Sequence, residues 1–330
     1  MEWRLLVPVV ATLVVVCVGG SPDEGPVWSC PQVTNDHSSI WCRCDLPHTL
    51  RCAGVGSSVE GIAAALRHLP AHQSISLLDL SIQNLSRIAP SAFRSLDGLH
   101  GLVISSGQIS HVAADAFDAS LTALGLPNNQ LVSVPTAALR SLIRLERLDL
   151  SNNRIGSIPD QLLSGMDQLR FLDLSGNLIS ALAPRAFSPA ASLRVLHLRS
   201  NLLTADQLVP MGSALRKLQE LDLGFNRIKG HLTSAFLAGL DNLVTLDLTA
   251  NNLTLLERGV LGSLKRLKHL RLAHNQVGVI EDQAFVSLTR LVQLDLSHNQ
   301  VVAISGQSLS HLNRFVSQNE MKSIKTNVIF

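Results

Sequence analysis

Four cysteines lie close together near the start of the chain, at Cys30, Cys42, Cys44 and Cys52. Cysteine thiolates either bind a metal such as zinc or oxidise in pairs to form disulfides. The spacing C-x11-C-x-C-x7-C lacks the paired Cys-x-x-Cys spacing of zinc sites, so disulfides are favoured over a metal. Four cysteines allow three pairings, and the spacing alone does not choose among them.

Two histidines, His274 and His298, stand 24 residues apart at the same place in a phrase that recurs along the chain. We expect their side chains to be neighbours, which raises the possibility of a pH-sensitive or metal-binding pair. No third ligand is evident, so neither a metal nor a cofactor is predicted. The GxSxG, HExxH, P-loop and dinucleotide-binding motifs of enzymes are also missing from the sequence. The chain is therefore not expected to be an enzyme.

A column of charged residues follows the central position of the same phrase. Aspartate is common at this position, and its simplest explanation is that it belongs to the repeat consensus. His197 and Arg271 interrupt the aspartates and are therefore more informative about binding. The candidate binding face consists of Asp149, Asp173, His197, Arg199, Asp222, Asp247, Lys268, Arg271 and Asp295. Acidic positions broken by basic ones would attract an acidic protein surface or a sulfated glycan.

Two sequons for N-linked glycosylation occur, at Asn84 and at Asn252. Each asparagine lies one position after a regularly recurring residue and is expected to point outward from a turn. Both sites should therefore be accessible, and in a secreted protein we expect both to carry glycans.

These residues are positioned by an internal repeat, which is marked by an asparagine that recurs in steps of 24 or 25 residues. The series is Asn129, Asn153, Asn177, Asn201, Asn226, Asn251, Asn275 and Asn299. Each asparagine belongs to a phrase such as LDLSNNRI at residues 148–155. A period in the twenties with the phrase LxxLxLxxNxL is the signature of a leucine-rich repeat.

Each phrase predicts a short strand, because Leu148 and Leu150 alternate with residues that point the other way. No turn residues allow a hairpin within one repeat, so the strand must pair with the equivalent strand of the next repeat. Stacked repeats then form a parallel sheet on the concave face of a curved solenoid, and neighbouring repeats supply the core. The asparagine amide offers donors and an acceptor to the backbone of successive turns, so its role is structural.

The recurring asparagines are called the asparagine ladder. A large apolar residue stands ten residues after each ladder position, and this second column continues toward the N-terminus beyond the first ladder asparagine. These residues are Phe93, Phe117, Leu139, Leu163, Phe187, Met211, Phe236, Leu261, Phe285 and Leu309. In the first two repeats Gln83 and Gly107 take the asparagine position. We count ten repeats and expect irregular segments and short helical turns on the convex face. The predicted fold class is α/β, a leucine-rich-repeat solenoid.

The 24-residue pattern LxxLxxLxLxxNxLxxLxxxxFxxL resembles the typical repeat class of extracellular animal proteins, which Toll-like, Slit-like and chaoptin-like proteins share. The resemblance covers roughly residues 72–310. The segment from Cys30 to Cys52 resembles the cysteine-rich N-terminal cap of the same family, in which the first cysteine pairs with the third and the second with the fourth. The resemblance therefore implies Cys30–Cys44 and Cys42–Cys52.

The N-terminus resembles a secretory signal, since Arg4 precedes an apolar run from Leu5 to Val18. A transmembrane anchor is the competing interpretation, but the run is shorter than the roughly 20 residues that span a bilayer. We expect a signal at residues 1–20, which would remove Cys17 from the mature protein. No other segment of this chain is expected to span a membrane.

The remaining chain divides into a cysteine-rich cap at 21–71, the repeats at 72–310 and a tail at 311–330. The tail lacks the repeated phrase and is expected to be irregular. Two explanations stay open for it: a truncated or mispredicted version of a longer surface protein, and a naturally short secreted form.

Composition limits the class of partner. The net charge of +2 does not demand nucleic acid or a membrane surface, and no nucleic acid partner is expected. The family resemblance implies a secreted or cell-surface protein that binds an extracellular protein through its concave face, in adhesion, guidance or receptor recognition. The alternatives are a fragment of an innate-immune Toll-type ectodomain and a protein that binds matrix or glycans.

Overall fold

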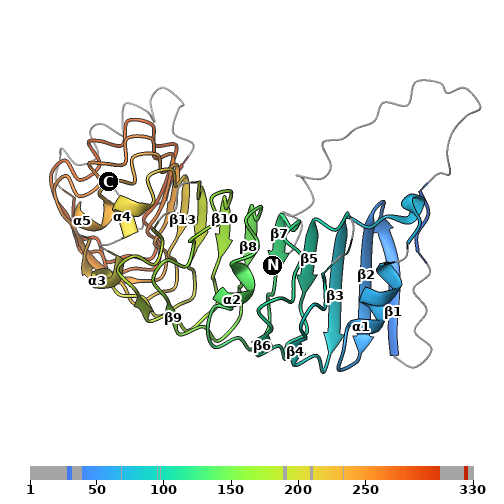
Figure 1. The fold of residues 1–330 in the computed structure, drawn as a ribbon. Helices are drawn as coiled ribbons and strands as arrows, with labels where there is room; N and C mark the ends of the chain where they lie inside the picture. The colour runs from blue at the N-terminus through green and yellow to red at the C-terminus, as the bar shows by residue number, and fades with distance from the viewer. Residues whose placement is uncertain are drawn as a thin grey trace, which may run out of the picture.

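The computed structural model describes residues 28–31, 39–67, 69–94, 96, 98–188, 192–208, 211–232, 234–304 and 323–325. These residues form a curved solenoid whose strands stand side by side along the arc (Figure 1). The expected signal at 1–20 with Cys17, and Leu309 of the apolar column, lie outside the described residues.

Within the described residues, the principal sheet has 13 strands that follow one another in chain order. They are β1 (Ser39–Leu46), β2 (Thr49–Val55), β3 (Leu77–Gln83), β5 (Gly101–Ile104), β7 (Ala123–Gly125), β8 (Arg147–Asp149), β10 (Phe171–Asp173), β12 (Val195–His197), β13 (Glu220–Asp222), β15 (Thr245–Asp247), β17 (His269–Arg271), β19 (Gln293–Asp295) and β21 (Ser323–Lys325). Only β1 and β2 pair antiparallel, and the later strands pair parallel. Equivalent positions are partners, as Leu148, Leu172 and Leu196 show. The predicted parallel sheet and solenoid fold are confirmed.

The other side of each repeat contains short elements. Its strands are β4 (Arg87–Ile88), β6 (His111–Val112), β9 (Ser157–Ile158), β11 (Ala181–Leu182), β14 (Lys229–His231), β16 (Asn252–Leu256), β18 (Val279–Ile280) and β20 (Ala303–Ile304). Its helices are α1 (Glu60–Leu66), α2 (Thr136–Leu139), α3 (Ala205–Leu208), α4 (Met211–Ala214) and α5 (Ser234–Leu237), with a 3-10 turn at Ala71–Gln73. The short parallel strands were not expected. Most are two or three residues long, too short for an alternating pattern to distinguish them from a loop.

The two apolar columns fill the interior. Leu148 and Leu150 are fully buried, and their equivalents in the other repeats are buried with them. In the second column Phe93 and Phe285 are among the largest fully buried side chains. The rings of Phe93 and Phe117 stack with centroids 6.3 Å apart, so the column continues through the two imperfect repeats.

The buried asparagines join each repeat to the one before it. Asn153 Nδ2 donates to the carbonyl oxygen of Leu126 at 2.8 Å and to that of Leu150 at 3.0 Å. Asn153 Oδ1 accepts from the backbone N–H of Leu131 at 3.0 Å. Equivalent bonds recur at the later ladder positions, for example at Asn201. Backbone groups that leave the sheet at each turn are thereby satisfied.

The first two repeats solve this problem differently. Gly107, at the ladder position of the second repeat, is exposed and has a φ of 77°. The preceding residue, Ser106, lies inside instead, with its Oγ 3.1 Å from the Leu85 carbonyl oxygen and 2.8 Å from Asn129 Oδ1. Gln83 is also exposed, because β3 is extended as far as this residue. Neither Gln83 nor Gly107 substitutes for a ladder asparagine.

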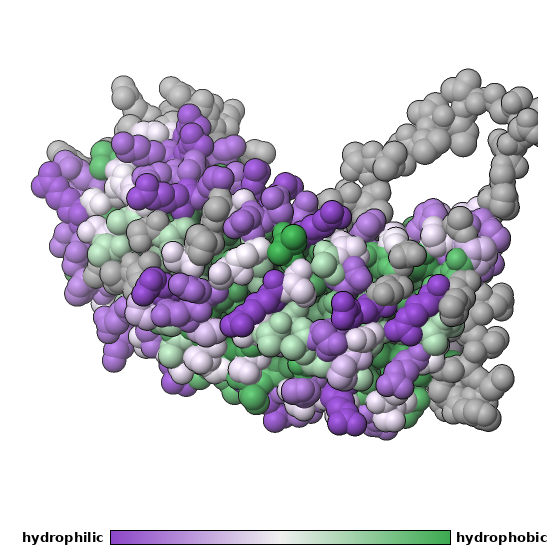
Figure 2. Space-filling model, viewed as in Figure 1, coloured by the Kyte–Doolittle hydropathy of each residue, from purple (hydrophilic) through white to green (hydrophobic). Residues whose placement is uncertain are grey.

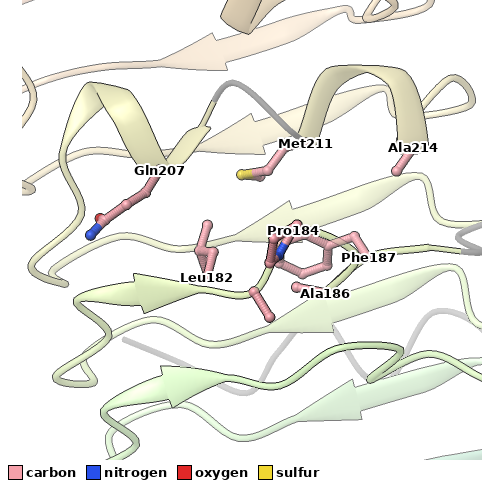
Figure 3. A pocket seen from close by; sticks show the side chains of 8 residues that line it. Leu182, Pro184, Ala186, Phe187, Gln207, Met211 and Ala214 are labelled. Atoms are coloured by element: carbon pink, nitrogen blue, oxygen red, sulfur yellow. The ribbon is translucent and has the colours of Figure 1, made fainter.

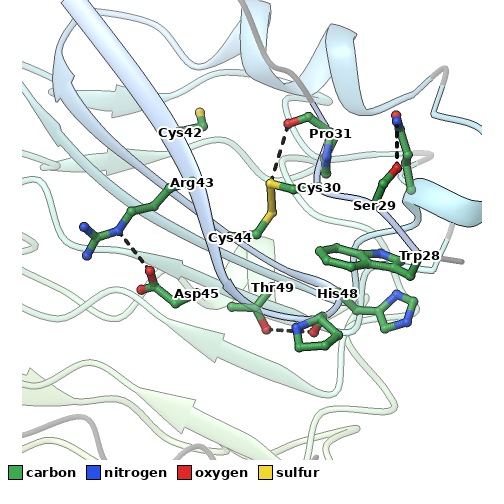
Figure 4. The surroundings of a disulfide bond; sticks show 12 residues. Trp28, Ser29, Cys30, Pro31, Cys42, Arg43, Cys44, Asp45, His48 and Thr49 are labelled. Atoms are coloured by element: carbon green, nitrogen blue, oxygen red, sulfur yellow. Dashed lines mark hydrogen bonds and ion pairs between the residues drawn. A yellow bond between two sulfur atoms is a disulfide. The ribbon is translucent and has the colours of Figure 1, made fainter.

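Two disulfides close the N-terminal end, Cys30–Cys44 and Cys42–Cys52, which is the pairing that the resemblance implies. Cys42 and Cys52 face each other across the β1–β2 hairpin. Figure 4 shows Cys30 bonded to Cys44 near Trp28, whose indole N–H donates to the Ser74 carbonyl oxygen at 3.0 Å. Because β2 pairs with β3 of the first repeat, this cap continues the sheet and covers the end of the core.

The C-terminal region differs from the expected irregular tail. Strand β21 pairs parallel with β19, and Gln293 is the register partner of Ser323. The strand begins 30 residues after its equivalent (323 − 293), whereas the repeat period is 24 or 25. The repeat period predicts the next strand several residues earlier, where the sequence lacks the repeated leucines. The longer connection therefore explains why the sequence does not predict β21.

Candidate functional site

The central positions of the inner strands form one continuous column. Backbone pairing aligns Arg51, Asp79, Val103, Gly125, Asp149, Asp173, His197, Asp222, Asp247, Arg271 and Asp295. Adjacent strands are about 4.8 Å apart, so each side chain can contact its neighbours. The structure therefore brings together seven of the nine residues predicted for the binding face. Arg199 lies two residues beyond His197 in the same repeat, and Lys268 lies just before β17.

The aspartates of this column have a structural role. Asp149 Oδ1 accepts from the backbone N–H of Ser151 at 2.8 Å, two residues further along the chain. The equivalent bonds of Asp173, Asp222, Asp247 and Asp295 are 2.8 to 3.1 Å long. Each carboxylate thus closes the turn that follows its strand. The sequence signal was the recurrent Asp-x-Ser/Thr/Gly, which explains why aspartate dominates the position.

His197 bridges carboxylates of two neighbouring strands. Its Nε2 lies 3.0 Å from Glu220 Oε1, and its Nδ1 lies 3.5 Å from Asp173 Oδ2. Burial opposes the charged imidazolium, but these hydrogen bonds and charges outweigh it and raise the pKa of His197 to about 10. The hydrogen bond with His197 in turn lowers the pKa of Glu220. His197 is therefore a cation at neutral pH with two carboxylate partners.

Arg199 and Arg271 converge on a buried carboxylate. Arg271 Nη1 lies 3.5 Å from Asp247 Oδ2. Arg199 Nη1 lies 3.8 Å from the same oxygen and 3.8 Å from Asp222 Oδ1. The basic interruptions that sequence analysis singled out are thus neutralised by carboxylates of the same face. This pairing gives no support to a sulfated-glycan site, which needs unpaired cations.

The acidic pair Asp149 and Asp173 lies at the N-terminal side of His197. Burial, followed by the negative charge of Asp173, raises the pKa of Asp149 to about 6. Burial also opposes ionisation of Asp173, but hydrogen bonds with His197 and Ser175 lower the pKa of this group. Burial likewise raises the pKa of Asp79 and of Asp222 in the same column.

A second, parallel column adds aromatic contacts that sequence analysis missed. The Arg147 guanidinium carbon lies 4.2 Å from the centroid of the Phe171 ring, and Phe171 packs edge-on against His197. Burial lowers the pKa of Arg147, and its Nε is buried without a hydrogen-bond partner. Arg147 and Phe171 each precede the first leucine of their strand, whereas the predicted binding face was drawn mainly from the position after that leucine.

The remaining predicted residues lie outside the central column. Lys268 is exposed and has no ion pair within the described part of the chain. His274 and His298 stack with ring centroids 4.1 Å apart, which confirms that they are neighbours. Among the described residues no group of three or more His, Cys, Asp or Glu side chains is placed to hold a metal ion. Asn84 and Asn252 are both exposed.

A small apolar hollow lies on the convex side of the described residues. Figure 3 shows a hollow between Leu182, Pro184, Phe187 and Met211. The space that a water-sized sphere can occupy there is about 10 Å³, enough for about one water molecule. Its apolar lining includes Phe187 and Met211 of the second apolar column, so the hollow belongs to the packing between two repeats.

The exposed surface differs along the arc. In the view of Figure 2, hydrophilic residues dominate the C-terminal end, and hydrophobic residues show between the N-terminal repeats. A membrane-crossing helix of sufficient length and apolarity does not occur in the part of the chain that the structure describes.

Comparison with known proteins agrees with this architecture. The leucine rich repeat profile matches residues 73–131, 119–179, 143–203, 216–277 and 265–317. A search of curated proteins finds no match.

Solved structures with a similar fold include receptor ectodomains bound to ligands. A chain of a TLR13–ssRNA13 complex is 26% identical with a TM-score of 0.65, over 82% of this chain and 38% of that one. A chain of the Toll–Spatzle complex of Drosophila is 23% identical with a TM-score of 0.64, over 75% of this chain and 37% of that one. The third is the ectodomain of the Arabidopsis thaliana receptor kinase GASSHO1/SCHENGEN3 in complex with CASPARIAN STRIP INTEGRITY FACTOR 2. It is 24% identical with a TM-score of 0.55, over 78% of this chain and 31% of that one. This chain spans less than two fifths of each of these chains.

The repeat profile covers well over half of the chain, and the structure supplies the parallel sheet and asparagine ladder that this profile describes. The chain belongs to the leucine-rich repeat family.

Proposed function

We propose that this chain is an extracellular, non-catalytic module that binds a secreted or cell-surface protein through its concave sheet face. The roles that fit such a module are cell adhesion, guidance and receptor recognition. The proposal rests on one observation: the inner strands align one column of residues in a single register from Asp79 to Asp295, most of them part-exposed, with Val103, Gly125 and Asp247 buried. A long, shallow surface of this kind suits a protein partner better than a small substrate.

The electrostatics of the face favour a protein over a polyanion. His197, Arg199 and Arg271 are each within 4 Å of carboxylates, so these three cations are paired within the face itself. Nucleic acid binding draws most of its affinity from neutralising phosphates. RNA is present in the TLR13 complex, but the paired charges of this face do not provide the equivalent attraction.

The two disulfides support an extracellular location, because such bonds persist mainly in oxidising compartments. The exposed sequons at Asn84 and Asn252 are compatible with passage through the secretory route, where we propose that both are glycosylated. Mass spectrometry of secreted protein before and after glycosidase treatment tests this. Unmodified peptides at both asparagines would contradict it.

A panel of purified extracellular domains tests the binding proposal. The chain is presented in a multivalent form, and each hit is repeated with Thr245→Arg, which adds a bulky cation to strand β15 of the concave face. Ser157→Arg on strand β9 of the opposite side is the matched control. We expect a specific partner whose binding is lost with Thr245→Arg and retained with Ser157→Arg.

Thermal melting must show that both variants fold like the parent. The proposal is wrong if the partner tolerates Thr245→Arg and is lost with Ser157→Arg, or if no domain of a broad panel binds.

A further inference from the structure

The residue before each ladder asparagine adopts a left-handed backbone. These residues are Asn128, Asn152, Gly176, Ser200, Phe225, Ala250, His274 and His298, with φ between 53° and 67°. Asparagine and glycine accept this conformation readily, whereas a bulky aromatic residue is a genuine outlier there. Phe225 therefore occupies a position at which its own side chain opposes the backbone conformation.

Burial does not compensate Phe225 for this strain, because 48% of the residue is exposed. The neighbouring repeats place Ser200 and Ala250 at the same position, which shows that the turn does not require an aromatic ring. Backbone strain at an exposed residue points to a function outside the fold.

The Arg199 guanidinium packs against the Phe225 ring. The Arg199 guanidinium carbon lies 4.3 Å from the ring centroid, while its Nη1 contacts Asp222 and Asp247. Arg199 reaches these groups by crossing Gly224. A Cβ at residue 224 would lie 2.6 Å from Arg199 Nη1, so the absence of a side chain leaves room for the guanidinium. The ring is thus exposed and lies against a guanidinium that is itself paired with two carboxylates.

The cations on the strands and turns of this region differ in whether they are paired. The Arg271 side chain is 47% exposed, and its Nη1 lies 3.5 Å from Oδ2 of Asp247, whose side chain is 8% exposed. Arg227, two residues after Phe225, is exposed and makes no ion pair with the described residues. The exposed carboxylate of strand β13, Glu220, is bonded to His197. A partner approaching Phe225 therefore meets an aromatic ring packed against the Arg199 guanidinium, with the exposed Arg227 two residues further along the chain.

We infer that Phe225 anchors a protein loop that carries an acidic residue beside a large apolar side chain. The apolar side chain packs on the Phe225 ring, and the carboxylate pairs with Arg227, the exposed cation two residues further along the chain. This inference rests on the proposed function, since it names the chemistry of the partner and the point on the rim of the concave face that the partner contacts.

A phage-displayed library of random 12-residue peptides, selected on the folded chain, tests the inference. Enriched peptides are synthesised, and their Kd is measured for the parent, Phe225→Asn, Gly224→Ala and Leu178→Asn. Leu178 is a matched control, because it is an apolar residue of another turn with 51% exposure. We expect Asp or Glu beside an aromatic or aliphatic residue, and a loss of about tenfold or more with Phe225→Asn.

The controls separate binding from folding. Gly224→Ala should weaken binding in the same direction by displacing Arg199, and Leu178→Asn should leave it within about twofold. Phe225→Asn should melt at the same temperature as the parent or higher, because asparagine suits the left-handed backbone. A lower melting temperature would assign the ring a structural role and overturn the inference.

Two other outcomes also overturn it. Enriched peptides that tolerate Phe225→Asn but are lost with Thr245→Arg would leave the concave-face proposal standing and remove the anchor. Peptides without acidic residues, or a selection without enrichment, would remove the partner chemistry, and the domain panel would then decide the proposed function alone.

Discussion

Two columns of the same repeat, the asparagine ladder and the central column of the concave face, follow opposite rules. The ladder is nearly invariant from Asn129 to Asn299, and its amides are bonded to the backbone in the same way in each repeat. In the central column the recurrent residue is an aspartate that closes a turn, and other residues replace it at Val103, Gly125, His197 and Arg271. Apart from the bond of each aspartate to the turn backbone, the contacts of this column run between side chains and differ from strand to strand.

The difference shows where this protein has freedom to vary. A buried amide that satisfies several backbone groups has no substitute of the same shape and polarity. A half-exposed aspartate can be replaced, since water can satisfy the N–H that it leaves. Positions at which the replacement brings new partners, as His197 and Arg199 do, are therefore the most informative about binding.

Breaking the uniform column should have the largest effect. Asn201→Leu removes the acceptor of the Ile179 N–H and the donor to the Leu174 and Leu198 carbonyls. Each unsatisfied buried group costs about 1–3 kcal/mol, so we expect a loss of about 3–5 kcal/mol in unfolding free energy. Denaturant unfolding measures it, with the exposed Gln276→Leu as control. A loss below about 1 kcal/mol would show that the ladder is dispensable.

The broken column should respond less. His197→Ala leaves the carboxylates of Asp173 and Glu220 without their shared cation. Because the site is only partly exposed, we expect a loss of about 2 kcal/mol at pH 7, compared by thermal melting with the exposed His111→Ala. The folded pKa of about 10 lies above the ordinary value of 6.5, so the difference should be full below about pH 6.5 and vanish as pH rises through 10. A difference that is constant up to pH 10.5 would contradict the ion pairs.

An opposite sign is expected at Asp149. Its folded pKa of about 6 lies above the ordinary 3.8, so ionisation destabilises the folded state. Asp149→Asn keeps an acceptor for the Ser151 N–H and should stabilise the protein by about 1–2 kcal/mol at pH 7. The gain should shrink as pH falls from 6 to about 3.8. Melting curves across this range check it, and a gain that is independent of pH would locate the effect elsewhere.

The smallest effect should come from the imperfect part of the ladder. Ser106→Ala removes a hydroxyl that lies near the Leu85 carbonyl oxygen and Asn129 Oδ1. Ser106 is partly exposed, so water can replace it, and we expect a loss of about 1 kcal/mol or less. A loss as large as that of Asn201→Leu would mean that the first repeats depend on the ladder as strongly as the later ones.

Much of this architecture follows from the sequence, because period and polarity determine it. The leucine and asparagine columns predict the strands, their parallel order and the burial of residues such as Leu148 and Asn153. A repeat built this way has one way to bury its apolar face. The strand at Ser323–Lys325 was missed since its spacing departs from the period, and Ser106 was missed since serine at that position carries no signal of burial.

The binding face was less accessible to sequence reasoning. Alignment of Asp173, His197 and Asp222 follows from the period, but their pairing depends on side-chain directions across strands. Free charge was expected at His197 and Arg271, and the structure neutralises both. The exposed ring of Phe225 gave no sequence signal, because its significance lies in a backbone angle and in the room left by Gly224.

The single-register sheet also determines how the molecule bears load. Among the described residues each inner strand pairs with the strand before it and the strand after it, so tension applied at the two ends is carried across all the boundaries between repeats, which can yield one at a time. A repeat of 24 residues that detaches can extend by roughly 80–90 Å, since a stretched chain spans at most about 3.6 Å per residue. Under tension the solenoid would lengthen in successive increments, and the remaining repeats would keep their inner surface while the outermost ones yield.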